Sequence, residues 1–194
     1  MTSFIFVCLV VAMLGMSMAP AHAQYREDAT SGLVGIKAGL FSRTNIDGET
    51  TTDGENVSFR TQVGSSAQLY ADFTLFSKTY LSTSFDFYYV QIVRNNQIML
   101  EGSLGLKRMI NLGFRKTRFK PGVAVGFAYL SRIGDLKSTD FVTVKGTLET
   151  HFIMTPRRTW LLELALIQSV SGGNSRYDLE FGPSLLVRVG LTFR

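Results

Sequence analysis

The sequence predicts an all-β fold, an eight-stranded antiparallel transmembrane β-barrel with an up-and-down meander topology. Three observations predict it. Apolar and polar residues alternate with a period of two in eight successive segments, which is the pattern of strands with two different faces. No charged residue falls on the apolar face of any of these segments. Finally, 45% of the 194 residues are hydrophobic but only 18% are charged, below the roughly 25% of ordinary soluble domains.

The first 23 residues carry no charged side chain and are typical of a targeting segment. The apolar run Phe4–Met18 is followed by Ala21-His22-Ala23, a small-x-small cleavage sequence. The alternative is a transmembrane anchor, but the polar stretch 24–30 favours cleavage before Gln24. We therefore expect residues 1–23 to be a cleaved signal peptide and residues 24–194 to form one outer-membrane β-barrel domain. The only cysteine, Cys8, lies in the cleaved part.

No apolar run in residues 24–194 is long enough for a membrane-spanning helix; a long one is Val123–Leu130. The alternating segments are, in order, residues 32–41, 57–75, 79–92, 97–108, 118–130, 141–153, 160–169 and 178–193. Turn-forming residues separate them. Within each segment, most apolar residues are either all even-numbered or all odd-numbered. They are even-numbered from Val34 to Leu40, from Ile98 to Leu106, from Val142 to Phe152 and from Trp160 to Leu166. They are odd-numbered from Val57 to Phe73, from Leu81 to Tyr89, from Phe119 to Tyr129 and from Leu179 to Phe193.

The residues on the opposite face decide between a soluble and a membrane barrel. That face mixes glycine, alanine and serine with charged residues, which suits a narrow and crowded interior, whereas the bulky apolar face suits contact with lipid. A closed barrel satisfies every backbone polar group within a bilayer. A secreted soluble barrel that binds an apolar ligand has the reverse orientation and remains the alternative.

Strand direction places both chain ends on the periplasmic side. The outer loops are then residues 43–56, 94–96, 131–140 and 171–177, and the periplasmic turns are 76–78, 109–117 and 154–159. Aromatic residues of the apolar face gather near both ends of the segments, as expected at the two membrane interfaces. They are Phe59, Tyr89, Phe127, Tyr129 and Phe181 at the outer ends and Phe73, Phe119, Phe152, Trp160 and Phe193 at the periplasmic ends.

Charged residues on the polar face are expected inside the barrel. An eight-stranded barrel is only wide enough for side chains to fill it, and buried charges are costly unless they pair. We therefore predict an ion-paired polar network whose role is structural or gating. Its predicted members are Lys37, Arg60, Asp72, Asp86, Glu101, Lys107, Lys145, Glu149, His151, Glu163, Glu180 and Arg188.

The net charge of +5 arises mainly at the periplasmic end. Basic residues are placed there with no acidic residue among them, so they are expected to face anionic lipid headgroups. They are Lys78, Arg108, Arg115, Lys116, Arg118, Lys120, Arg157, Arg158 and Arg194. A nucleic-acid site would combine basic residues with stacking aromatics on one surface. The aromatics here lie on the other face, so no nucleic-acid partner is expected.

Three stretches carry a resemblance to a known family: Ala21-His22-Ala23, the run from Arg118 to Gly126, and the ending from Leu185 to Phe193. With the full-length pattern, they resemble the small eight-stranded outer-membrane β-barrel proteins of Gram-negative bacteria. This resemblance implies a monomer in the cell outer membrane that contacts membrane lipid and lipopolysaccharide. It also implies that Phe193 is the insertion signal for the barrel-insertion machinery, although Arg194 follows where the family usually ends in an aromatic residue.

Some barrels of this kind resemble lipid A deacylases or palmitoyltransferases. His151 is the only histidine after residue 23, and Glu149 lies on the same face as a possible orienting group. However, the deacylase pattern places a serine two residues after the histidine, where this chain has Ile153. We therefore expect no enzyme, and a structural or surface-interaction role for the outer loops. The alternatives are a lipid A-modifying enzyme that uses His151 and a narrow solute channel.

Neither a cofactor nor a metal site is expected. The acidic first loop contains Asp47-Gly48-Glu49 and Asp53-Gly54-Glu55, but this spacing lacks the full ligand pattern of a calcium loop.

Overall fold

The computed structural model describes residues 32–92, 95–114, 116–131, 138–155 and 158–193. The predicted signal peptide 1–23 lies outside the described residues. The strands are β1 (Leu33–Phe41), β2 (Asn45–Thr50), β3 (Asn56–Arg60), β4 (Gly64–Phe76), β5 (Thr79–Ile92), β6 (Asn95–Arg108), β7 (Thr117–Leu130), β8 (Thr139–Thr155), β9 (Arg158–Gly173), β10 (Tyr177–Phe181) and β11 (Ser184–Phe193). Within the described residues, no helix is long and apolar enough to cross a membrane.

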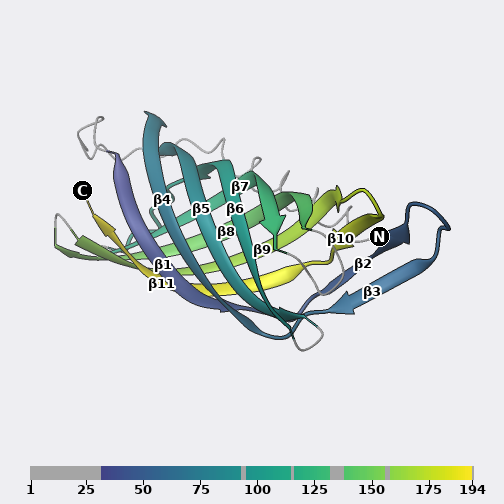
Figure 1. The fold of residues 1–194 in the computed structure, drawn as a ribbon. Helices are drawn as coiled ribbons and strands as arrows, with labels where there is room; N and C mark the ends of the chain where they lie inside the picture. The colour runs from purple at the N-terminus through teal and green to yellow at the C-terminus, as the bar shows by residue number, and fades with distance from the viewer. Residues whose placement is uncertain (1–31, 93–94, 115, 132–137, 156–157, 194) are drawn as a thin grey trace.

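A closed barrel forms from the strands β1, β4, β5, β6, β7, β8, β9 and β11, each paired antiparallel with its neighbours (Figure 1). The barrel closes because β11 pairs with β1 on one side, as in Val34 opposite Phe193, and with β9 on the other, as in Leu191 opposite Trp160. The predicted all-β, eight-stranded meander barrel is therefore confirmed.

The three remaining strands form an extension of the sheet, which we call the outer sheet: β10, β2 and β3. β10 joins the end of β9 through Asp178 opposite Gly173, then pairs with β2, which pairs with β3. Figure 1 shows β2 and β3 projecting beyond one end of the barrel, with β10 beside β2. The first predicted outer loop, 43–56, thus contains β2, and the last, 171–177, contains the end of β9 and the start of β10. The predicted segments 57–75 and 178–193 are each two strands.

The apolar face of the barrel strands points outward, as predicted. Val34, Leu69 and Val125 are 58, 60 and 59% exposed. On the polar face, Lys37 and Glu101 are buried inside the barrel. A closed sheet with an exposed apolar band and a charged interior is the arrangement of a membrane-spanning barrel, since lipid covers the apolar band and no strand edge is left open.

The outward assignment is wrong for the apolar residues of the outer sheet. Leu179 and Phe181 are buried, and Val57 and Phe59 pack against the buried apolar cluster. The reason is a change of phase where each predicted segment breaks, at residues 61–63 and 182–183. Odd-numbered residues face inward before each break and outward after it, so an unbroken odd-numbered apolar pattern conceals the reversal.

Candidate functional site

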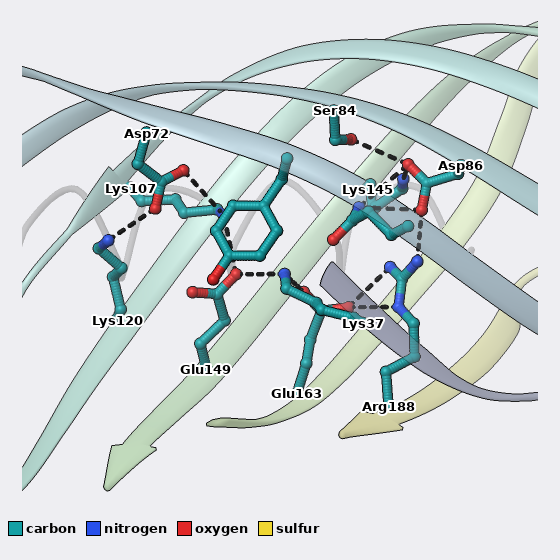
Figure 2. Close-up of polar contacts among 12 residues, drawn as sticks. Lys37, Asp72, Ser84, Asp86, Lys107, Lys120, Lys145, Glu149, Glu163 and Arg188 are labelled. Carbon is teal, nitrogen blue, oxygen red and sulfur yellow. Dashed lines mark hydrogen bonds and ion pairs between the residues drawn. The ribbon is translucent and has the colours of Figure 1, made fainter. Parts of the chain in front are cut away.

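The predicted interior residues come together on the inner wall of the barrel, with two exceptions. The structure places these members in the interior, all buried: Lys37, Asp72, Asp86, Glu101, Lys107, Lys145, Glu149, His151, Glu163 and Arg188. They lie on seven of the eight barrel strands, and ion pairs join them into one chain of contacts that crosses the lumen (Figure 2).

The periplasmic part of this network begins at Lys120. The Lys120 ammonium donates to Asp72 at 2.6 Å, and Lys107 contacts the other oxygen of Asp72 at 3.2 Å. Lys107 also donates to Glu149 at 2.7 Å, and the same Glu149 oxygen accepts from Lys37 at 2.5 Å. Cations and carboxylates therefore alternate, so each buried charge has an opposite charge in contact.

The central part of the network contains its only buried arginine among the described residues. Lys37 also pairs with Glu163. Two nitrogens of Arg188 contact the other oxygen of Glu163, Nε at 2.7 Å and Nη2 at 2.6 Å. The Nη1 group of Arg188 donates to Asp86. A planar guanidinium supplies several donors in fixed directions, which allows one side chain to bridge two carboxylates.

The outer part of the network runs from Asp86 to Glu101. Lys145 lies between them, 2.9 Å from Asp86 and 3.0 Å from Glu101. Glu101 additionally accepts from the Tyr88 hydroxyl at 2.6 Å and from Thr143 at 2.7 Å. Neutral hydroxyls thus complete the carboxylate's hydrogen bonds where the ionic region meets the apolar end of the lumen.

An aromatic ring separates two of the cations. Tyr70 lies with its ring centroid 4.3 Å from Lys37 and 4.8 Å from Lys107, and its hydroxyl is 2.6 Å from that of Thr192. The ring has room because Gly35 lies opposite: a Cβ there would come within 2.5 Å of the ring. Glycine on the inner face therefore serves the packing of a cation–π contact rather than a turn.

The network contains as many cations as carboxylates, with His151 in addition. One cation was assigned to the wrong place: Lys120, predicted on the periplasmic rim, is fully buried and ion-paired. Position 120 lies on the polar face of β7, and β7 begins at Thr117, so the side chain is already within the barrel.

Two predicted network members are wrong. Arg60 and Glu180 are exposed on the outer sheet, where Arg60 lies opposite Asn45 and Glu180 opposite Asp47. Both precede a phase change, so their even numbers put them on the outside. Their loss and the gain of Lys120 give the interior its charge balance.

His151 lies at the periplasmic end of the network and is 5% exposed. Its Nε2 atom is 2.8 Å from a Glu149 oxygen, and the other oxygen of Glu149 receives Lys37 and Lys107. In the described part of the chain, no serine hydroxyl is hydrogen-bonded to His151. The carboxylate that could orient a catalytic base is thus engaged by two lysines as well.

The outer half of the lumen is filled by a buried apolar cluster, which sequence reasoning missed. Its rings include Phe41 and Tyr88, with centroids 5.4 Å apart, and Phe141 and Phe181, 5.3 Å apart. The other buried members are Ile46, Val90, Ile92, Met99, Ala128, Leu130, Ala165, Ile167, Leu179 and Leu186. The outer sheet supplies Ile46, Leu179 and Phe181, so its buried face packs against the outer end of the lumen. A smaller buried cluster of Leu33, Tyr80 and Met109 lies at the periplasmic end.

A signal for the apolar cluster was present in the sequence. At the outer ends of strands the alternation gives way to adjacent apolar pairs, as in Tyr89-Val90, Tyr129-Leu130 and Leu185-Leu186. Both faces of a strand are apolar there, which indicates lipid on one side and a packed lumen on the other.

The outward face of the outer sheet is acidic. Glu180 lies directly opposite Asp47, and Asp178 directly opposite Glu49. All four side chains are exposed. Carboxylates facing each other across a strand pair destabilise the pairing, so the buried apolar side of this sheet must offset that cost.

At the other end, the described exposed or half-buried basic residues are Lys78, Arg108, Lys116, Arg118 and Arg158. Phe193, the predicted insertion signal, is 42% exposed on β11 opposite Val34. Its aromatic ring therefore lies on the lipid side near the periplasmic end.

Comparison with known proteins rests on structure, because no protein-family profile matches this sequence and no curated protein sequence matches it. Neisserial surface protein A has 9% sequence identity and a TM-score of 0.57, over 86% of this chain and 99% of that one. The outer membrane protein OprG from Pseudomonas aeruginosa has 10% identity and a TM-score of 0.56, over 85% of this chain and 97% of that one.

The chain has the fold of the small outer-membrane β-barrels. Its exposed apolar band and charged interior are those of an integral membrane barrel, and OprG, which has this fold, is a bacterial outer-membrane protein. At such low identity the likeness establishes the fold alone, and members of one fold differ in activity.

Proposed function

We propose that this outer-membrane barrel is a non-conducting protein with a structural and surface-interaction role, exerted through its outer sheet. The observation that carries the proposal is the filled lumen. The apolar cluster occupies the outer half and the charge-balanced network the remainder, so the side chains that would line a pore pack against each other instead.

The outer sheet supports the second half of the proposal. It is an ordered extension held by strand pairing rather than a loose loop, and it presents Asp47, Glu49, Asp178 and Glu180 to the exterior. Sequences keep locally unfavourable charge pairs mainly where function requires them. The sign of this face suits cationic surfaces or polymers.

Reconstitution tests the non-conducting part. The mature chain, refolded into a planar phospholipid bilayer, should produce no discrete conductance steps. Stepwise conductance from heat-modifiable, folded protein would refute the proposal and favour the channel. An altered lipid A mass on expression, lost in His151→Ala, would instead favour the enzyme.

Binding tests the interaction part. Proteoliposomes made from zwitterionic lipid should bind fluorescent polylysine in a salt-sensitive manner. A variant with the four carboxylates changed to amides should lose most of this binding and still fold, because like-charge repulsion between β2 and β10 is removed. Amide changes at Asp53 and Glu55, in the same loop but outside these cross-strand pairs, provide the control. Equal binding by all three proteins would contradict the role assigned to the sheet.

A further inference from the structure

An apolar groove of about 510 Å³ runs over the lipid-facing side of the barrel at its closing seam. It crosses β9, β11, β1, β4 and β5. Its floor contains Ala38 and Ala67, which pair directly across β1 and β4 with both methyl groups pointing outward. Trp160 stands at one end, and Phe85 and Phe87 at the other. The two alanines make the depression because their neighbours are much larger.

The groove has a direction that strand register defines. Along one row of paired residues, Trp160 lies opposite Leu191, Leu191 opposite Ile36, Ile36 opposite Leu69, and Leu69 opposite Phe85. Trp160 is the third residue of β9, at the periplasmic end, whereas Phe85 lies halfway along β5. The groove therefore rises from the periplasmic interface to the middle of the membrane, the depth that one acyl chain of the periplasmic leaflet occupies.

The charge at the lower end completes the site. Arg158 lies two residues before Trp160 on the same outward face of β9 and is exposed. No acidic side chain is exposed at the periplasmic end of the described residues. An anionic headgroup placed at Arg158 would meet favourable charge while its chain followed the groove upward.

We propose that this groove binds one anionic glycerophospholipid of the periplasmic leaflet, with its headgroup at Arg158 and one acyl chain over Ala38 and Ala67. The volume lies within the range of small-molecule sites, roughly 300–1,000 Å³. The proposal depends on the membrane orientation of the barrel and is independent of the surface role proposed above.

Trp160 makes the test direct, because it is the only tryptophan of the chain. The mature protein is refolded into phosphatidylethanolamine vesicles that contain a small fraction of phosphatidylglycerol or phosphatidylethanolamine brominated in the part of the acyl chain nearest the headgroup, the part that would lie beside Trp160. Bromine quenches tryptophan fluorescence on contact. Brominated phosphatidylglycerol should occupy the groove in preference by about fivefold, the contribution of one interfacial arginine.

Two variants separate a bound lipid from ordinary lipid contact. Arg158→Gln should abolish the preference for phosphatidylglycerol, whereas Lys116→Gln, another exposed periplasmic cation, should keep it. Filling the groove with Ala38→Leu and Ala67→Leu should reduce quenching to the level of brominated phosphatidylethanolamine. Val125→Leu on the opposite wall is the control.

Equal quenching of the native protein by the two brominated lipids would overturn the proposal, as would a preference that survives both Arg158→Gln and groove filling. Cross-linked barrel pairs that disappear when the groove is filled would show that a second copy occupies it instead. Heat-dependent gel mobility verifies that each variant is folded.

Discussion

Removing Arg188 tests whether the interior network stabilises the barrel through charge balance. Arg188 is fully buried and bridges Glu163 and Asp86. In Arg188→Met these carboxylates keep only Lys37 and Lys145 as cationic partners, and the network gains one uncompensated negative charge. Breaking a buried ion pair by removing one partner typically costs about 3–5 kcal/mol.

The assay is reversible urea unfolding of residues 24–194 in phospholipid vesicles, followed by Trp160 fluorescence. Arg188→Met should lower the free energy of unfolding by about 3–5 kcal/mol. Arg43→Met, the same substitution at an exposed site, should change it by less than about 0.5 kcal/mol. Similar small effects from both substitutions would contradict the proposed contribution of the network.

A second variant separates charge balance from lost packing. Adding Glu163→Leu to Arg188→Met removes a cation and a carboxylate together, and Lys37 keeps Glu149 at 2.5 Å. We expect the double variant to recover stability, with a coupling of about 1–3 kcal/mol between the sites. Simple additivity of the two destabilisations would show that charge balance is not the cause.

Three further predictions concern other parts of the barrel. Gly126→Ala should destabilise the barrel by about 1–3 kcal/mol, because the new Cβ would clash with the carboxylate of Glu101 and come within 2.6 Å of the Thr143 hydroxyl. Gly102→Ala, where a Cβ meets nothing within 4 Å, should be neutral, and thermal unfolding on gels compares the two. Phe193→Ala should slow insertion by purified barrel-insertion machinery more than Phe152→Ala, which removes a ring of similar exposure; equal rates would remove the signal role. Glu49→Lys should stabilise the pairing of β2 with β10 by about 0.2–1 kcal/mol, measured as slower hydrogen exchange of β10, and unchanged exchange would contradict the pairing.

Most of the barrel could be predicted because a period of two is a strong constraint. In β1 and β6, a single alternation runs through the whole strand, so Lys37 and Glu101 had to lie opposite the exposed leucines. Membrane strands show this pattern more fully than soluble ones, since every outward position must be compatible with lipid.

The misplaced residues lie where the two-residue period does not reveal which face of the strand points inward or where the strand begins. Arg60 and Glu180 sit just before short irregular links that reverse the face while keeping the numbering pattern intact. Lys120 was misplaced because the start of β7 could not be located from alternation. The pairing of β2 with β10 joins segments about 130 residues apart in sequence, as in Asp47 opposite Glu180, and no local pattern encodes it.

The groove beside Trp160 could not be predicted for a related reason. Ala38 and Ala67 each look like ordinary small residues on an apolar face. Only the register between β1 and β4 puts them opposite each other and makes one depression from two separate alanines.

A membrane-spanning barrel requires that the outward side of its wall touch lipid. The chain after residue 23 has no cysteine, so single cysteines can be introduced at the outward positions 125, 127 and 129 of β7, and at 47 and 49 of the outer sheet, and spin-labelled. Collision rates with oxygen, which dissolves in hydrocarbon, and with a water-soluble nickel complex are then measured in vesicles. Positions 125, 127 and 129 should collide preferentially with oxygen, and positions 47 and 49 with the nickel complex. Preferential collision with the nickel complex at 125, 127 and 129 would contradict a membrane-spanning barrel.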